Sequence, residues 1–125
     1  MNGLELFSRQ QYLNLETIRK SGEAVRTPVW FVRDMDTLYV RTMANSGKVK
    51  RIRNNSNVKI APCKMDGALL GEWIPALAHE VKDIETDRKV DRLLDKKYGL
   101  MKKLFYLMGA LRRRKNTKLI INPLG

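Results

Sequence analysis

Three residues at the start of a predicted helix, Ser46, Gly47 and Lys48, have the types and spacing expected of a phosphate-binding turn. A predicted strand ends just before them at Thr42, and the Ser46 hydroxyl is suited to accept a free backbone N–H of the first helical turn. Gly47 allows an anion to approach the main chain, and Lys48 adds positive charge to the helix N-terminus, so we predict that this turn anchors a phosphate. Val49 and Ile52, three residues apart, are expected to turn inward and fix this helix to a core. The alternative is a capped surface helix with solvated lysines. This stretch alone does not separate the two, since it is not the eight-residue Gly-rich loop of nucleotide triphosphatases.

A second group that suits a phosphorylated ring compound lies in the strand predicted over residues 24–32. Side chains alternate between the two faces of a strand, so Arg26 and Trp30 are expected on the same face. Arg26 then offers a charge for a phosphate, and Trp30 offers a ring that borders a planar heterocycle. Pro28 predicts an edge position or a bulge, because proline has no N–H to donate to a neighbouring strand. The alternative is that Trp30 belongs to the core and Arg26 is an exposed strand residue.

The side chains offer little reactive chemistry. The sequence contains one histidine, His79, and one cysteine, Cys63, so one chain cannot assemble a zinc-binding cluster and we predict no metal site. No Gly-x-Ser-x-Gly motif indicates acyl transfer, and Cys63 is expected to fill apolar space on a strand. We also predict no catalytic side chain. If the protein is an enzyme, a bound cofactor carries the reaction while the protein binds and orients it.

Positive charge is concentrated in two segments of the 125-residue chain, whose formal net charge is +12. Six basic residues and no acidic one fall between positions 43 and 65, and five basic residues and no acidic one fall between positions 112 and 118. Such clustering indicates an anionic partner, which is a small molecule, a nucleic acid or a lipid surface. Nucleic acid is disfavoured because residues 48–64 contain no aromatic side chain on which a base can stack.

Length and composition predict one domain, residues 1–125, in the cytoplasm. Hydrophobic residues make up 43% of the chain, which is typical of a packed globular domain. No run of about 18 apolar residues predicts a membrane span, and the N-terminal residues lack the pattern of a signal peptide. A single cysteine fits a reducing compartment.

The apolar pattern predicts a β-dominated (β+α) fold, a six-stranded antiparallel barrel. Strands are expected at residues 12–19, 24–32, 38–42, 58–65, 69–81 and 118–123, and the basic helix at 46–55 follows the third of them. From 86 to 114 apolar residues recur at helical spacing, which predicts a helical insertion before the last strand, divided or bent at Gly99. This insertion is expected to pack on the barrel or on a partner subunit. A substrate lid or a membrane-surface contact is the alternative.

In order and spacing, several segments resemble the pyridoxamine 5′-phosphate oxidase-like FMN-binding split-barrel superfamily. The similarity is greatest to the subfamily that uses the 8-hydroxy-5-deazaflavin coenzyme F420. The segments that carry the resemblance are Arg26–Phe31, Leu38–Thr42, Ser46–Arg53, Val58–Cys63 and Gly71–Trp73, within a match that extends from about Tyr12 to Leu124. The resemblance implies a six-stranded split barrel that forms a homodimer with cofactor sites at the subunit interface.

The resemblance also implies a cofactor site. Arg26, Ser46 and Lys48 anchor phosphate in this scheme, Thr42 hydrogen-bonds it, and the main chain of the strand from Thr27 to Val29 lines the ring, which Trp30 borders. FMN-dependent oxidases of the superfamily carry basic residues at the positions of Gly47 and Phe31, so this sequence departs from the pattern for tight FMN binding and pyridoxine-phosphate oxidation. The bases that follow suit a longer anionic tail. The predicted cofactor-binding residues are Arg26, Thr27, Pro28, Val29, Trp30, Thr42, Ser46, Gly47, Lys48, Lys50 and Arg51.

Together these observations predict a flavin- or deazaflavin-dependent oxidoreductase. Hydride passes between bound coenzyme F420 or FMN and a small organic substrate. One alternative is a non-catalytic carrier or sensor that binds a flavin, a deazaflavin or haem on the same fold. The other is a nucleic-acid-binding barrel.

Overall fold

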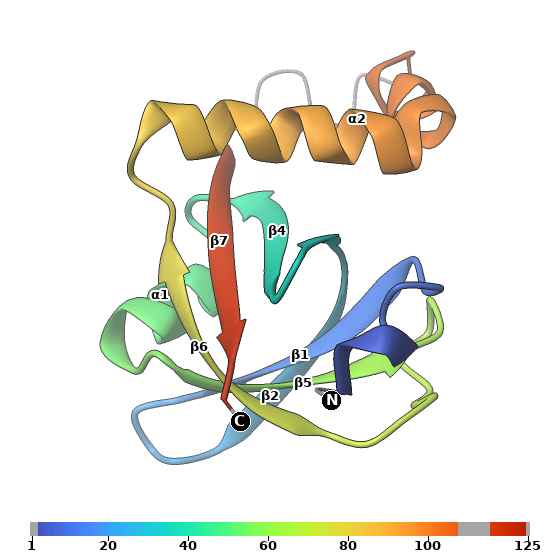
Figure 1. Ribbon diagram of the computed structural model, residues 1–125. Coiled ribbons are helices and arrows are strands. Elements are labelled where there is room, and N and C mark those ends of the chain that lie inside the picture. The colour runs from blue at the N-terminus through green and yellow to red at the C-terminus, as the bar shows by residue number, and fades with distance from the viewer. Residues whose placement is uncertain (1–2, 108–115, 125) are drawn as a thin grey trace.

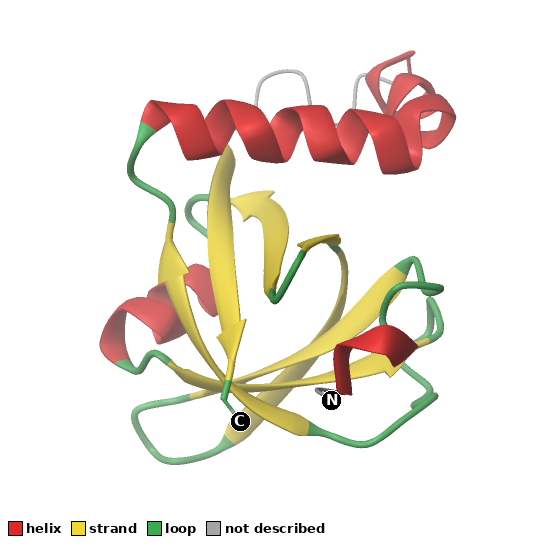
Figure 2. Ribbon diagram, in the orientation of Figure 1, coloured by secondary structure: helices red, strands yellow, loops and turns green. Residues whose placement is uncertain are grey.

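A bent antiparallel sheet with two α-helices outside it forms the body of the protein (Figures 1 and 2). The structure is a computed structural model, and it describes residues 3–107 and 116–124. The strands are β1 (Tyr12–Ile18), β2 (Ala24–Trp30), β3 (Val32–Asp34), β4 (Thr37–Met43), β5 (Asn57–Cys63), β6 (Ile74–Glu80) and β7 (Asn116–Pro123). The helices are the short 3₁₀ helix η1 (Gly3–Leu6), α1 (Gly47–Asn54) and α2 (Ile84–Leu107).

The seven strands form one sheet in the order β2-β1-β5-β6-β7-β4-β3. β2 and β3 are the two ends of this order, so the sheet stays open, although its bend brings β2 into contact with β4. The fold is therefore a β-dominated half-barrel. Pro28 lies in the edge strand β2, as predicted, where its missing N–H removes no ladder bond from a central strand.

The prediction of six strands is wrong because the segment 24–32 is divided at Phe31. Before this residue β2 pairs with β1, and after it β3 pairs with β4. The backbone of Phe31 bonds to α2 instead, since its N–H donates to the Tyr98 hydroxyl at 3.2 Å and its carbonyl accepts from Lys97 Nζ at 2.9 Å. The predicted strand 69–81 is also shorter, because residues 69–73 form a loop before β6.

The inner face of the sheet and one face of α1 enclose the main hydrophobic core. Val49 and Ile52 of α1, predicted to turn inward, are 0% and 3% exposed. Side chains near the end of β2 alternate as predicted, so that Val29 packs in this core while Trp30 faces α2. Cys63 is a buried free thiol on β5, which confirms its role as an apolar filler.

α2 lies across the outer face of β3, β4 and β7, where it buries a second apolar cluster (Figure 1). Val90, Leu94 and Tyr98 of the predicted helical stripe are buried there. The helix leaves helical geometry at Tyr98 (φ −119°, ψ 16°), one residue before the predicted bend at Gly99. Residues 108–115, which hold the end of the predicted insertion and most of the second basic segment, lie outside the described residues. No helix in the described part of the chain is long and apolar enough to cross a membrane.

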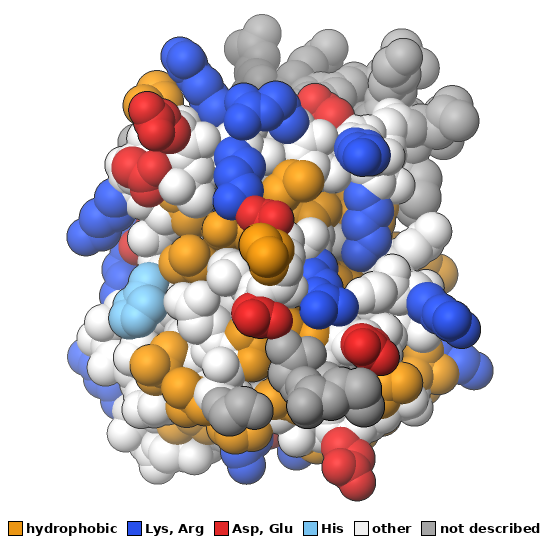
Figure 3. Space-filling model, viewed as in Figure 1, with side chains coloured by type: hydrophobic (Ala, Val, Ile, Leu, Met, Phe, Trp, Pro, Cys, Tyr) orange, Lys and Arg blue, Asp and Glu red, His pale blue; other side chains and the backbone are white. Residues whose placement is uncertain are grey.

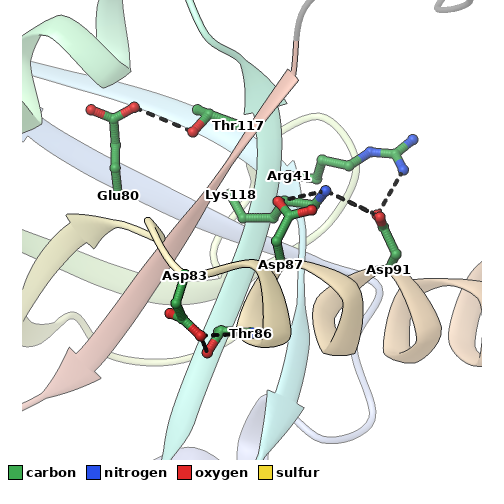
Figure 4. Close-up of polar contacts among 8 residues, drawn as sticks. All are labelled: Arg41, Glu80, Asp83, Thr86, Asp87, Asp91, Thr117 and Lys118. Atoms are coloured by element: carbon green, nitrogen blue, oxygen red, sulfur yellow. Dashed lines mark hydrogen bonds and ion pairs between the residues drawn. The ribbon is translucent and has the colours of Figure 1, made fainter.

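Charged groups also fix α2 to the sheet (Figure 4). Arg41 of β4 and Lys118 of β7 are cross-strand partners, so two like charges lie opposite each other. Asp87 and Asp91, one turn apart on α2, neutralise them. Lys118 Nζ lies 3.0 Å from Asp87 Oδ1 and 3.1 Å from Asp91 Oδ1, and Arg41 Nη1 lies 3.4 Å from Asp91 Oδ1. We call Arg41, Asp87, Asp91 and Lys118 the acid-balanced cluster.

Candidate anion-binding site at the start of α1

The predicted phosphate-binding turn joins the end of β4 to α1. Lys48 Nζ donates a hydrogen bond to Thr42 Oγ1 at 3.0 Å. One turn further on, Arg51 Nε donates to Oγ1 of Thr17, on β1, at 2.6 Å. Both cations are therefore held by neutral hydroxyl groups of the sheet. We call Thr17, Thr42, Ser46, Lys48 and Arg51 the hydroxyl-supported cluster.

Ser46 precedes α1 but does not cap it as predicted. Its side chain makes no hydrogen bond to the first turn, and its Oγ is buried without a hydrogen-bond partner in the described structure. A buried polar atom without a partner is unfavourable and calls for an explanation. An anion bound at this turn supplies one, because the hydroxyl can donate to an anionic oxygen.

The electrostatics of the cluster favour an anion. Burial, and secondly the charge of Arg51, lower the pKa of Lys48. Burial, and secondly the charge of Arg19, lower the pKa of Arg51. The positive forms of both side chains are therefore less favourable here than in water, and a bound anion would restore them.

Gly47 leaves room for the Arg51 guanidinium. A Cβ atom at this position would lie 2.7 Å from Arg51 Nη1, closer than two such atoms can approach without a shift. The small residue therefore lets the end of Arg51 fold against the first turn of α1. A guanidinium thus lies beside the position at which FMN-dependent relatives were expected to carry a second base.

Arg26 has different partners. Its Nε lies 3.0 Å from Glu16 Oε1, and its Cζ lies 4.8 Å from the centroid of the Trp73 ring. The structure does not bring Arg26 into the hydroxyl-supported cluster, so its role as a phosphate ligand stays a prediction.

The residues predicted to line a flavin ring lie on the edge strand β2. Because this strand pairs with β1 on one side, the backbone groups on the other side of Thr27, Pro28 and Val29 point away from β1. Trp30 stacks on Tyr98 of α2, with ring centroids 4.6 Å apart and planes 6° from parallel. One face of the indole is therefore covered, and only the rest of the ring is left to border a ligand.

The two remaining bases of α1 differ in their partners, because Arg53 is bound by a carboxylate and Lys50 is exposed. Arg53 is bound to both carboxylate oxygens of Glu80, at 2.6 Å and 3.1 Å, and this hydrogen bonding lowers the pKa of Glu80. Lys50 is exposed on the helix, and its proposed contact with an anionic tail stays a prediction. Sequence reasoning missed Thr17 and Arg19, because nothing local in the strand pattern shows that they lie next to a helix some 30 residues later.

The strand order and the helix after β4 define the class of fold, which is that of the pyridoxamine 5′-phosphate oxidase-like split barrels. No protein-family model and no curated protein matches the sequence. Solved structures match the fold, with sequence identities of 14%, 15% and 16% for the three that follow. The resemblance inferred from the sequence is thereby confirmed at the level of the fold.

The first of the three is a protein from Listeria innocua provisionally named a pyridoxamine 5′-phosphate oxidase, with a TM-score of 0.70 over 98% of this chain and 90% of its own. HutZ, the haem storage protein from Vibrio cholerae, matches with a TM-score of 0.73 over 97% of this chain and 87% of its own. A protein named F420 reductase matches with a TM-score of 0.62 over 100% of this chain and 96% of its own.

Proposed function

We propose that the protein is an oxidoreductase that binds coenzyme F420 or FMN, with the phosphate of the cofactor on the hydroxyl-supported cluster. The observation that carries this proposal is the buried Ser46 Oγ at the turn before α1, which has no hydrogen-bond partner among the described residues. The bases Lys48 and Arg51 of this helix bond to the hydroxyls of Thr42 and Thr17. The fold supports it, because structural neighbours include proteins named for an F420 reductase and a pyridoxamine 5′-phosphate oxidase.

The residues present fit such a cofactor. Lys48 uses one of its three N–H donors on Thr42, which leaves two for phosphate oxygens. Arg51 and the Ser46 hydroxyl add further donors, and the helix N-terminus adds a partial positive charge. When bound, the flavin or deazaflavin supplies hydride transfer, while the chain anchors the phosphate and lines the ring with the edge of β2.

The proposal includes a homodimer in the cytoplasm, with the cofactor between subunits and a small organic molecule as substrate. Leu69 and Leu70, which follow β5, are exposed apolar side chains. Leu6 is also exposed, and its Cδ1 would lie 3.3 Å from a Cβ at Gly71, so these apolar residues form one patch. An exposed apolar patch of this kind supports a protein partner. Light scattering of the purified protein measures the oligomeric state, and a monomer would contradict this part of the proposal.

Titration of the purified protein with FMN and with coenzyme F420, followed by fluorescence, tests the cofactor site. We expect Lys48→Ala to weaken binding by about 10- to 100-fold, the effect of losing a charge-assisted hydrogen bond of about 1–3 kcal/mol. Lys64→Ala is the matched control, because Lys64 is an exposed base that follows the last residue of β5, whereas α1 precedes the first. Equal dissociation constants for wild type and Lys48→Ala would remove this site from the proposal.

The second candidate function is a non-catalytic carrier or sensor of a flavin or haem. The similarity to the haem storage protein supports it, as does the lack of a predicted catalytic acid or base. Steady-state reduction of an added electron acceptor by the cofactor-loaded protein separates the two candidates. Stoichiometric binding of haemin, seen as a shifted Soret band, together with no turnover would favour the carrier.

A further inference from the structure

A cavity of about 640 Å³ lies on a different part of the molecule from α1. It opens between the β2–β3 corner, which supplies Phe31, Val32 and Arg33, and α2, which supplies Leu93, Lys96 and Lys97. Figure 3 shows the molecule in the orientation of Figure 1, and several Lys and Arg side chains lie on the right-hand part of the face turned to the viewer, below α2. The volume lies within the range of about 300–1,000 Å³ that is typical of ligand pockets. The cavity shares no residue with the hydroxyl-supported cluster.

The basic side chains of the cavity are held by neutral oxygen atoms. Arg33 donates from Nε to the carbonyl of Met35 at 2.6 Å and from Nη1 to Ser8 Oγ at 2.7 Å. Lys97 Nζ donates to the carbonyl of Phe31 at 2.9 Å and lies 3.7 Å from the centroid of that ring. Lys96 lies beside it, and both lysines are exposed, although Lys97 also lies against the Phe31 ring. The lining residues that the structure describes contain these three bases and no acid.

An apolar side chain stands at the opening of the same cavity under backbone strain. Met35 has φ +57°, a left-handed backbone conformation that residues other than Gly, Asn and Asp rarely adopt. Its side chain is 83% exposed. Met35 and Asp36 form the two-residue turn between β3 and β4, and tight hairpin turns of this length require positive φ. This turn places a long, flexible apolar side chain on the cavity wall together with the partly buried Leu93.

We propose that this cavity binds a small molecule with an apolar body and a single anionic head, such as a medium-chain carboxylate. The head lies among Arg33, Lys96 and Lys97, and the body lies along Leu93 and Met35. Partial removal of water from the ammonium group lowers the pKa of Lys97 to about 8, and a bound carboxylate offsets this effect by stabilising the protonated form. This inference does not rest on the proposed cofactor, because it uses other residues.

NMR titration of the full chain with octanoate tests the inference, with 1-octanol and octylamine as probes of equal length and different head. We expect octanoate to shift the amide signals of residues 31–35 and 93–97, and to bind about tenfold more tightly than octanol. Lys97→Gln should weaken octanoate by about tenfold while it keeps a donor for the Phe31 carbonyl. Met35→Ala should weaken octanoate and octanol alike, because it shortens the apolar wall.

Lys20→Gln is the control for net charge, because Lys20 lies in the exposed turn after β1. It should change octanoate affinity by about twofold or less, the effect of a distant surface charge. Equal affinity for octanoate and octanol, or equal loss in Lys20→Gln and Lys97→Gln, would overturn the inference. So would shifts centred on α1. None of these results bears on the titration with FMN or coenzyme F420, which reports on the hydroxyl-supported cluster.

Discussion

Two clusters of basic side chains in this protein are held by different kinds of oxygen. In the acid-balanced cluster, Lys118 is only 7% exposed and is bound by Asp87 and Asp91 of α2. In the hydroxyl-supported cluster, Lys48 and Arg51 are held by the hydroxyls of Thr42 and Thr17. The first set of charges is neutralised within the fold, whereas the structure gives the second no acidic partner among residues 3–107 and 116–124.

This difference distinguishes charges that the fold neutralises from charges that it leaves to the proposed ligands in a strongly basic chain. A carboxylate partner offsets the desolvation of a base, so the pair contributes to holding two elements together. A hydroxyl orients a base but leaves its charge available to a ligand. The same distinction assigns Arg53, which is bound to Glu80, to the fold. Lys97, which is held by a carbonyl oxygen, follows the second pattern, in agreement with the proposed ligand site.

The largest effect on stability is expected for Asp91→Asn. This change leaves Arg41 and Lys118 opposite each other with Asp87 as the remaining acid. We expect the free energy of unfolding to fall by about 2 kcal/mol, less than for a fully buried pair because Asp91 is partly exposed. Urea unfolding measures the change, with Glu72→Gln in the exposed loop before β6 as the control. Equal stability of the two variants would mean that the acid-balanced cluster does not hold α2.

Removing a base from the hydroxyl-supported cluster should not lower the free energy of unfolding. We expect Lys48→Met to leave the free energy of unfolding of the ligand-free protein unchanged or to raise it by up to about 1 kcal/mol, because a desolvated charge next to Arg51 is lost. The same variant should bind FMN or coenzyme F420 more weakly. A clear loss of stability would show that Lys48 serves the fold and would remove the contrast between the clusters.

Gly47→Ala tests the geometry of the hydroxyl-supported cluster with a smaller effect. The new Cβ displaces the end of Arg51, which is flexible, so the free energy of unfolding should change by less than about 0.5 kcal/mol. Affinity for inorganic phosphate, measured by calorimetry, should fall by about threefold to tenfold. Gly99→Ala is the matched control, since a Cβ there meets no atom of the described residues within 4 Å. The same affinity in both variants would mean that Arg51 is not part of the site.

The smallest expected effect is a pH dependence that comes from Lys97, because this side chain is exposed and solvent screens the shift in its pKa. Its pKa is lowered from 10.5 to about 8, so between these values the unfolded chain binds more protons than the folded one, and stability should rise with pH. Burial raises the pKa of Tyr98 above its usual value of 10.0, so above pH 10.0 this group makes the free energy of unfolding fall as the pH rises. The measurement is therefore made below pH 10.0. Unfolding curves of wild type and Lys97→Gln between about pH 8 and 9.5 give the comparison. Parallel pH profiles would show that Lys97 is as well solvated in the folded chain as in the unfolded one.

Local patterns predicted much of the fold. Alternation in the strand at 24–32 assigned Val29 to one face and Trp30 to the other, and the spacing of Val49 and Ile52 gave the buried side of α1. The basic helix and the long amphipathic helix were also predicted, the latter from apolar residues that recur at helical spacing. These features are set by residues that are close together in the sequence, so the order of apolar and polar residues predicts them.

The features that were missed depend on distant residues. Phe31 divides a predicted strand because Tyr98 of α2 satisfies its backbone, and the local pattern around Phe31 contains no trace of this. The hydroxyl-supported cluster was predicted in part, through Thr42, Ser46 and Lys48. Its partner Thr17 was not predicted, because only the folded chain brings β1 next to α1.

The position of β7 in the sheet has a consequence for the order of assembly. It lies between β6 and β4, so it is the strand that joins β2-β1-β5-β6 to the β4-β3 hairpin. Residues 116–123 come after every other described strand, and during synthesis they leave the ribosome after them. Until then, β4 and β6 each present an unsatisfied edge, and Arg41 lacks its cross-strand neighbour Lys118, with which it shares Asp91. The two parts of the sheet therefore cannot be joined before β7 is available, and exposed edges of this kind favour misassembly.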